Sequence, residues 1–245
     1  MESLGVLIPS RARPDILEEC LFNLSSFDRA NILDVVIVSD DHDETFEFAR
    51  KFSRRDIFRK YTVIQAPERL YPVKAFNFTL ENCESELFCW LADDAVFPKF
   101  DWISKVFEVF LKMFPDNIGV LGMHKDGPGL GASSKSFVKY NGEFYHSGYN
   151  VHYADMELGM KALMLGRYTF LGEGVGHQRL LLEKRPPMDL KERYEFIRKD
   201  KILFSERKNN KFYIDKRKLI NPIELNLNAG FHWEHISMPL PKGVS

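Results

Sequence analysis

Two adjacent carboxylates, Asp93 and Asp94, directly follow an apolar run at residues 87–91. A short run of this kind is typical of a strand that is buried on both faces. Because burying a carboxylate without a partner is very costly, both side chains must emerge at the carboxyl end of the strand, where open α/β sheets bind ligands. Carboxylate oxygens suit Mg²⁺ or Mn²⁺, with a phosphate on the far side of the ion. The alternative for this segment alone is a strand followed by an Asp-capped turn.

The elements that position this pair alternate along the chain. Apolar runs at residues 5–10, 34–41 and 61–66 are separated by segments with the apolar spacing of helices. This alternation predicts βαβ units, and therefore an α/β fold with a mostly parallel, doubly wound sheet and helices on both faces. Further helices are expected at residues 72–82, 100–114 and 154–163, and further strands at 118–123 and 168–171.

Composition and short motifs exclude several classes of protein. The chain has 245 residues and a net charge of −1, which argues against a surface built wholly for nucleic acid. No GxGxxG follows the first strand and no P-loop motif occurs, so a dinucleotide-binding Rossmann site and a P-loop are excluded. Three cysteines without a CxxC pair, no signal-peptide pattern and no apolar run of about 20 residues predict a cytoplasmic protein without a transmembrane segment.

Basic and amide side chains lie where two helices are expected to begin. Arg11 and Arg13 follow the first strand and either clamp a phosphate or lie in a solvated turn. Lys74 and Asn77 lie near the start of the helix at 72–82, whose free N–H groups and dipole favour anions. If they bind phosphate, these residues extend the candidate site beyond the pair of carboxylates.

Residues 126–136 are rich in glycine and are expected to form a mobile loop beside the site. A long loop in this place is typical of a lid. The alternative is a cradle for a phosphate, although the spacing of the glycines fits no phosphate-binding motif.

The chain changes character from residue 180. Between residues 183 and 218 there are 13 Lys and Arg against 7 Asp and Glu. We therefore expect two units: a catalytic domain at 1–179, and a basic, helical and irregular extension at 180–245 that packs on it, with a helix at 190–204. The basic run is a solvated face or, alternatively, a surface for an anionic acceptor or an acidic membrane.

Six short motifs occur in the order and spacing of the family-2 glycosyltransferases with the GT-A fold, which the chain resembles from about residue 4 to residue 177. The opening VLIPSR is similar to the family's VIIPTYNR, and VIVSDD is similar to its VVDDGS. LADDAVFP resembles the region of the DxD motif, whose final Asp corresponds to Asp94. KAFN stands at the place of the A-R-N element, Asp155 at the Asp of the ED motif, and His177 at a third ligand of metal or phosphate.

The resemblance implies transfer of a sugar from a nucleoside diphosphate sugar, with a UDP-sugar favoured, by a single inverting displacement. It implies that Asp94 and His177 hold a divalent ion, Mn²⁺ or Mg²⁺, and that Asp155 is the general base. The expected acceptor is a glycan or a lipid-linked sugar, with nucleic acid as an alternative. The residues expected to bind the nucleotide sugar are Pro9, Ser10, Arg11, Arg13, Asp40, Asp41, Lys74, Asn77 and Asp93.

Three residues depart from the family's motifs. Ala92 replaces the first Asp of DxD, Phe76 replaces the Arg of A-R-N, and Ala154 replaces the Glu of ED. Ala92 and Ala154 favour an alternative in which a degenerate GT-A domain binds a nucleotide or a glycan without catalysis. A nucleotidylyltransferase shares the sheet architecture, but the absence of glycine directly after the first strand disfavours it.

Overall fold

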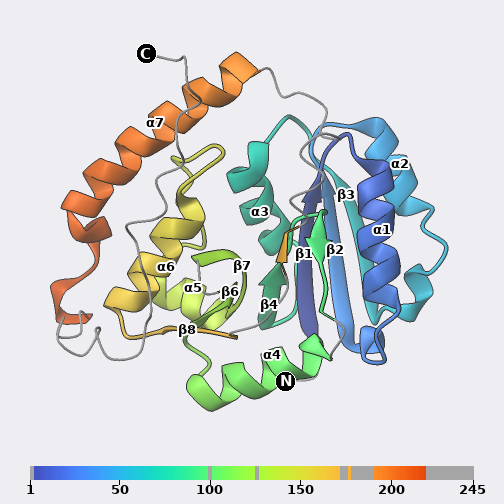
Figure 1. The fold of residues 1–245 in the computed structure, drawn as a ribbon, viewed down its shortest axis with the longest axis horizontal. Coiled ribbons are helices and arrows are strands. Elements are labelled where there is room, and N and C mark those ends of the chain that lie inside the picture. The colour runs from blue at the N-terminus through green and yellow to red at the C-terminus, as the bar shows by residue number, and fades with distance from the viewer. Residues whose placement is uncertain (1–2, 99–100, 125–126, 172–175, 178–189, 219–245) are drawn as a thin grey trace.

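The computed structural model describes residues 3–98, 101–124, 127–171, 176–177 and 190–218. Its main sheet has seven strands in the order β3-β2-β1-β4-β7-β6-β8 (Figure 1). β4 therefore lies at the centre of the sheet, directly before the paired carboxylates. The strands are β1 (Leu4–Ser10), β2 (Leu33–Ser39), β3 (Lys60–Gln65), β4 (Leu87–Trp90), β6 (Val120–His124), β7 (Gly127–Ser134) and β8 (Tyr168–Phe170).

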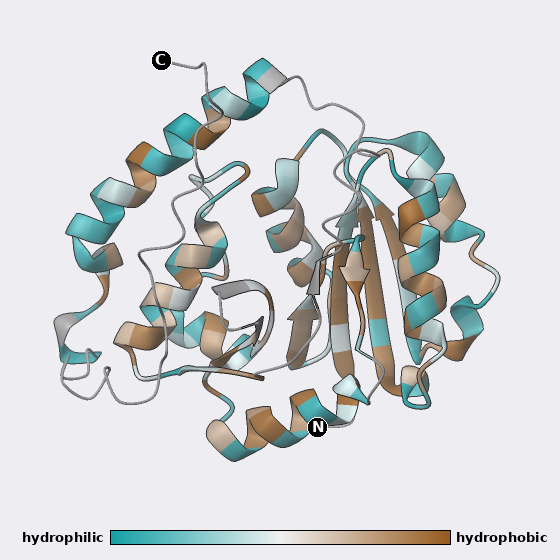
Figure 2. Ribbon diagram, in the orientation of Figure 1, coloured by the Kyte–Doolittle hydropathy of each residue, from teal (hydrophilic) through white to brown (hydrophobic). Residues whose placement is uncertain are grey.

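Strands β1 to β4 form the parallel half of the sheet, and they alternate with helices as predicted. β1 pairs in parallel with β2 and β4, and β2 pairs in parallel with β3. Their residues are mostly apolar because both faces of the sheet are covered (Figure 2). Helices α1 (Pro14–Ser25) and α2 (Asp43–Arg50) pack on one face, and α3 (Tyr71–Glu81) packs on the other. The predicted mostly parallel, doubly wound α/β sheet is confirmed.

Pro9 lies inside β1, although proline has no N–H group for a ladder. β1 pairs with β2 along its whole length, but it pairs with β4 only over Leu4 to Leu7. Pro9 therefore lies beyond the end of β4, where its nitrogen is not needed for a bond to that strand. One side of β1 is left open at the carboxyl edge of the sheet.

The expectation of a mobile glycine-rich loop is wrong for residues 127–134, which form β7. β7 runs antiparallel between β4 and β6, and β8 pairs in parallel with β6. The small residues are needed because Gly131 lies against the indole of Trp90, and a Cβ at this glycine would lie 2.4 Å from a ring carbon. Glycine in this strand thus marks a close approach of a large side chain rather than flexibility.

Four further helices complete the layers: α4 (Trp102–Met113), α5 (Lys135–Asn141), α6 (Ala154–Met164) and α7 (Leu190–Asn209). α4 joins the apolar layer of α1 and α2, whereas α5 and α6 join that of α3. The sequence did not predict α5. Ser134 caps its start, because its hydroxyl accepts a hydrogen bond from the N–H of Phe137 at 3.0 Å, and Gly142, with a φ of 94°, caps its end.

The predicted helix in the basic C-terminal segment is confirmed as α7, which runs alongside α6 on the outside of the molecule (Figure 1). α7 is largely hydrophilic (Figure 2), yet it is not only a solvated face, because Asp200 and Arg207 are buried. Residues 211–213 form a 3₁₀ turn. The last 27 residues lie outside the described part of the chain. The division into two units at residue 180 stays a prediction.

Among the helices that the structure describes, none is both long enough and apolar enough to cross a lipid bilayer.

We expect Gly131→Ala to lower the free energy of unfolding by ~1–3 kcal/mol, the usual cost of overpacking a core. Denaturation by urea, followed by tryptophan fluorescence, measures this loss. The atoms that the new methyl group meets first are carbons of the six-membered ring of Trp90. In a Trp90→Phe background that ring is absent, so Gly131→Ala is expected to cost less there. Equal losses in both backgrounds contradict the close approach of the indole.

Candidate active site at the carboxyl edge of the sheet

The ends of the parallel strands are held together at the edge where the predicted site residues lie. The N–H of Asp40 donates to the carbonyl of Ser10 at 2.9 Å, which joins the end of β2 to the end of β1. The N–H of Leu91 donates to the carbonyl of Leu7 at 3.0 Å, which continues the pairing of β4 with β1. The loops that follow three strands therefore start from one rigid edge, as expected for a ligand site in this kind of sheet.

Asp93 and Asp94 lie in a tight turn after β4, in which the N–H of Ala95 donates to the carbonyl of Ala92 at 3.0 Å. The two carboxylates are almost completely buried. Asp93 accepts a hydrogen bond from the hydroxyl of Ser10 at 2.6 Å and another from the guanidinium of Arg13.

The guanidinium of Arg13 also lies 3.7 Å from the carboxylate of Asp94. Its side chain is only 18% exposed, so the alternative of a solvated turn does not hold for this residue. Arg13 instead supplies the positive charge that buried carboxylates require. The structure thus brings together Ser10, Arg13, Asp93 and Asp94.

The backbone of His177 lies beside this turn. β5 (Ala95–Val96) pairs antiparallel with β9 (Gly176–His177), and in this ladder His177 faces Ala95. A residue more than 80 positions further along the chain is therefore placed next to the neighbour of Asp94. The side chain of His177 is outside the described atoms, so its role as a ligand stays a prediction.

Asp40 is buried and caps the start of α3. Its carboxylate accepts hydrogen bonds from the N–H of Leu70 and from the N–H of Tyr71, the latter at 3.1 Å. Burial raises the pKa of Asp40, while these two N–H groups and the charges of Arg11 and Arg69 oppose the rise.

Asp41, by contrast, is exposed and has a φ of 53°. The sequence left open which of the two carboxylates meets the nucleotide. The structure gives Asp40 bonds within the protein and leaves Asp41 at the surface.

The amide side chain of Asn77 is engaged with the backbone of the segment before α6. It donates to the carbonyl of Tyr145 at 2.8 Å, and it accepts from the N–H of the same residue at 3.1 Å. Lys74 is exposed on α3. Arg11 is partly buried, and its Nε has no hydrogen-bond partner among the described atoms. Contacts of these three residues with a nucleotide sugar stay predictions.

Asp155 lies in the first turn of α6 and is partly exposed. Burial, and then the nearby charge of Asp155, raise the pKa of Tyr145. The ring centroid of Tyr145 lies 6.4 Å from that of Trp90, the last residue of β4. The candidate base thus lies near Tyr145, whose ring is close to that of the residue at the end of the strand before the paired carboxylates.

The first turn of α7 contacts the start of α3, which no pattern in the sequence predicts. Glu192 accepts hydrogen bonds from the hydroxyl of Tyr71 at 2.5 Å and from the guanidinium of Arg69 at 3.3 Å. These residues are more than 120 positions apart and belong to no common motif, so no local signal was available. The contact places the basic C-terminal segment next to the residues that Asp40 caps.

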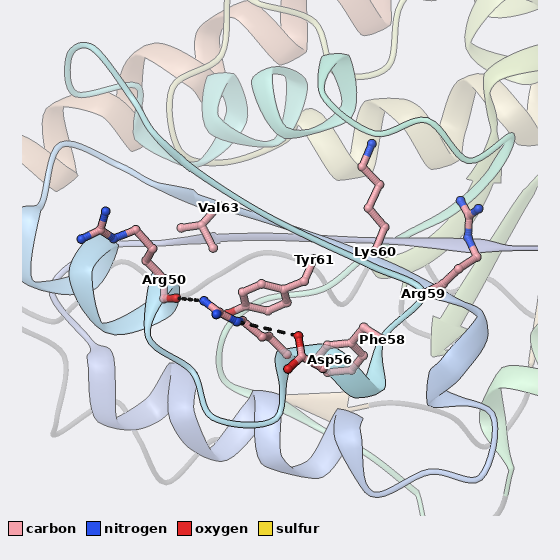
Figure 3. Close-up of a pocket in the computed structure, with 8 residues that line it drawn as sticks. Arg50, Asp56, Phe58, Arg59, Lys60, Tyr61 and Val63 are labelled. Atoms are coloured by element: carbon pink, nitrogen blue, oxygen red, sulfur yellow. Dashed lines mark hydrogen bonds and ion pairs between the residues drawn. The ribbon is translucent and has the colours of Figure 1, made fainter.

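A hollow of about 470 Å³ lies elsewhere, along the edge strand β3 (Figure 3). Its lining runs from the end of α2 through the loop before β3 into the first residues of that strand, whereas most of the predicted site residues lie at or after the last residues of strands. Its basic side chains are engaged: Arg59 binds the buried Asp34, and Lys60 lies 2.6 Å from Glu84. The lining residues are Arg50, Arg55, Asp56, Phe58, Arg59, Lys60, Tyr61 and Val63, and none of them is a predicted site residue.

Residues 5–168 match the model of the family described as glycosyl transferase family 2. The chain belongs to this family. No curated protein matches the sequence of this family-2 chain.

Solved structures share its fold at low sequence identity. The mannosyltransferase PcManGT from Pyrobaculum calidifontis, in complex with GDP-Man and Mn²⁺, is 19% identical with a TM-score of 0.57. That match covers 68% of this chain and 54% of the mannosyltransferase. TarS 1–349 from S. aureus, in complex with UDP-GlcNAc, is 18% identical with a TM-score of 0.56, and the match covers 72% and 59% of the two chains. The family-2 chain therefore has the GT-A fold and spans a little over half the length of these proteins.

The raised pKa of Asp40 predicts a pH-dependent stability. The folded state holds the proton more tightly than the unfolded state, so unfolding releases protons between the ordinary pKa of 3.8 and the raised value. The free energy of unfolding therefore falls as the pH rises through this window. Asp40→Asn lacks this titrating proton. As the pH rises through the window, the free energy of unfolding of wild type is therefore expected to fall relative to that of the variant.

Urea denaturation of wild type and Asp40→Asn over a series of pH values tests this expectation. Asp41→Asn, at the exposed neighbouring position, is the matched control. A stability difference between wild type and Asp40→Asn that does not change with pH contradicts the raised pKa.

Proposed function

We propose that this family-2 chain transfers a sugar from a nucleoside diphosphate sugar to an acceptor hydroxyl. The observation that carries the proposal is the turn at the carboxyl edge of the sheet, where Asp93 and Asp94 meet Arg13 and the backbone of His177. Structural neighbours in complex with GDP-Man and UDP-GlcNAc support a nucleotide sugar as the donor. A UDP-sugar donor, a glycan or lipid-linked sugar as acceptor, and a cytoplasmic location belong to this proposal.

The residues of the turn suit a divalent ion. A carboxylate and an imidazole are ligands that Mn²⁺ accepts, and the β5–β9 ladder places His177 next to the residue that follows Asp94. In the part of the chain that the structure describes, no cluster of three or more His, Cys, Asp or Glu side chains forms a complete site. We propose that Asp94 and His177 hold Mn²⁺ or Mg²⁺ together with the donor diphosphate. The bound ion would supply charge neutralisation to the departing diphosphate.

The chain's own residues supply the remaining chemistry. Asp155 accepts the proton of the acceptor hydroxyl as this attacks the anomeric carbon. One base opposite the leaving diphosphate gives a single displacement with inversion of the anomeric carbon. Arg11 adds charge at the diphosphate, a role supported by its Nε, which has no hydrogen-bond partner among the described atoms.

The remaining donor contacts follow from the strand ends. Asp41 contacts the ribose or base, and Asp40 holds the start of α3 beside it. Asp93, fixed by Ser10 and Arg13, lies next to the ribose or beside the metal.

A second candidate function is binding of a nucleotide or glycan without catalysis. Ala92 and Ala154 stand at two places where the family has acidic residues, and Arg13 already neutralises the carboxylates of the turn. An assay for slow hydrolysis of a sugar nucleotide in Mn²⁺ without an acceptor distinguishes a transferase from a binding protein, because only a transferase releases free sugar. Membership of glycosyl transferase family 2 argues against the third alternative, a nucleotidylyltransferase.

We expect Asp155→Asn to lower kcat for transfer by ~10²–10⁴, because the acceptor hydroxyl loses its base. The affinity for the donor nucleotide should stay unchanged, since Asp155 acts on the acceptor. Steady-state kinetics and calorimetric titration with UDP and GDP measure the two quantities. Asp56→Asn, a side chain that is 94% exposed, is the matched control and should behave as wild type. Equal rates for Asp155→Asn and wild type show that Asp155 is not the general base.

We expect Asp94→Ala to remove the effect of Mn²⁺ on nucleotide affinity. In the presence of Mn²⁺ the affinity should fall by at least ~10-fold, because a loss of this size follows even when a group that only hydrogen-bonds to a metal ligand is removed. Calorimetric titration of UDP and GDP, with Mn²⁺ and with a chelator, measures the effect. Asp56→Asn again serves as the control. If Mn²⁺ raises the nucleotide affinity of Asp94→Ala as much as that of wild type, Asp94 is not a metal ligand.

A further inference from the structure

Asp200 is a charged residue in the middle of α7 that is only 1% exposed. Its carboxylate accepts hydrogen bonds from the backbone N–H groups of three consecutive residues, Asn150 at 3.1 Å, Val151 at 2.8 Å and His152 at 3.0 Å. Backbone N–H groups that converge on a carboxylate make charge-assisted hydrogen bonds, which are stronger than neutral ones. α7 follows the part of the chain that matches the family, which ends at residue 168.

A second contact from the same helix lies seven residues, or about two turns, further on. The guanidinium of Arg207 donates two hydrogen bonds to the carboxylate of Glu157, at 2.8 and 2.6 Å. The hydroxyl of Tyr149 donates to the same carboxylate at 2.7 Å. α7 therefore holds the chain on both sides of Asp155: the segment 150–152 before it and Glu157 after it.

The short segment between these two contacts determines where Asp155 lies. Tyr153, which directly precedes α6, has a φ of 70°, a left-handed conformation that non-glycine residues adopt only where their surroundings hold them. The carbonyl of Asn150 accepts a hydrogen bond from the N–H of Val73 at 3.2 Å, which also ties the segment to α3. The direction in which the chain enters α6 thus depends on the bonds made by residues 150–152, and most of these bonds end on Asp200.

We propose that Asp200 is a positioning residue for Asp155, acting through the backbone of residues 150–152. The inference rests on the proposed transfer function, in which Asp155 is the base. Asp200 is a ligand of the backbone and touches no reacting atom. Its loss leaves three N–H groups short of an acceptor, shifts the first turn of α6, and moves the base away from the acceptor hydroxyl. A displacement of about 1 Å at a catalytic group is enough to cost ~10²-fold in rate.

Two measurements on the full chain test this proposal, with Asp200→Asn as the variant and Lys201→Ala as its matched control at the exposed neighbouring position. The first is hydrogen exchange of the backbone amides without substrate. Asp200→Asn is expected to speed the exchange of Asn150, Val151 and His152 and of the first turn of α6. Unchanged exchange at these amides overturns the inference, whatever the enzyme does.

The second measurement is kcat for transfer in the presence and absence of the candidate base. Asp200→Asn is expected to lower kcat by ~10–100-fold in the wild-type background, with the KM for the donor unchanged. In an Asp155→Asn background the same substitution is expected to change kcat less than about 3-fold, because its effect passes through Asp155. Equal losses in both backgrounds show that Asp200 only stabilises the fold, and they overturn the inference.

A variant that fails to fold, and a failure of the proposed base, can each be distinguished from a failure of the positioning role. If Asp200→Asn does not fold, Asp200→Glu keeps the carboxylate one methylene further out, and the same two outcomes apply to it. If the wild-type chain transfers sugar and Asp155→Asn abolishes transfer while Asp200→Asn leaves kcat intact, only the positioning role fails. If Asp155→Asn transfers as fast as wild type, the proposed base fails, and the positioning of that base falls with it.

Discussion

The need to neutralise buried carboxylates at the end of the central strand is the constraint on which the site depends. Asp93 and Asp94 are almost completely inaccessible to water, and a buried charge without partners is too costly to persist. Ser10 and Arg13 supply these partners from the end of β1 and the turn before α1. The loop after β1 is therefore held to the loop after β4 by contacts within the chain, at the edge where the candidate site lies.

The same requirement recurs at two other buried carboxylates that join segments far apart in the chain. Asp34, buried in β2, is bound by Arg59 and by Ser85. Asp40 joins the end of β2 to the start of α3. Removing one partner of such a pair leaves a buried charge uncompensated, which is strongly destabilising. The positions of the loops around the candidate site follow from these pairings as much as from apolar packing.

Helix α7 extends this principle to the other side of the site. Its hydrophilic sequence predicts a solvated face, yet Asp200 and Arg207 are buried and hold the segments around Asp155. A helix beyond the matched part of the family thus becomes part of the support of the candidate base. In family-2 chains whose C-terminal segments differ, the same base would need another support.

The sequence by itself determined the parallel half of the sheet, its helices and the edge at which the carboxylates emerge, because apolar period and strand length are local properties. It did not determine β7, since glycine favours loops in isolation, and it is the indole of Trp90 and the carbonyl of Leu121 that leave no room for a Cβ at Gly131. Nor did it determine the partners of Asp40, Asp93 and Asp200, which lie 30 to 83 positions away along the chain. Tertiary structure alone decided these pairings, because a buried charge is satisfied by whichever donors the fold brings within reach.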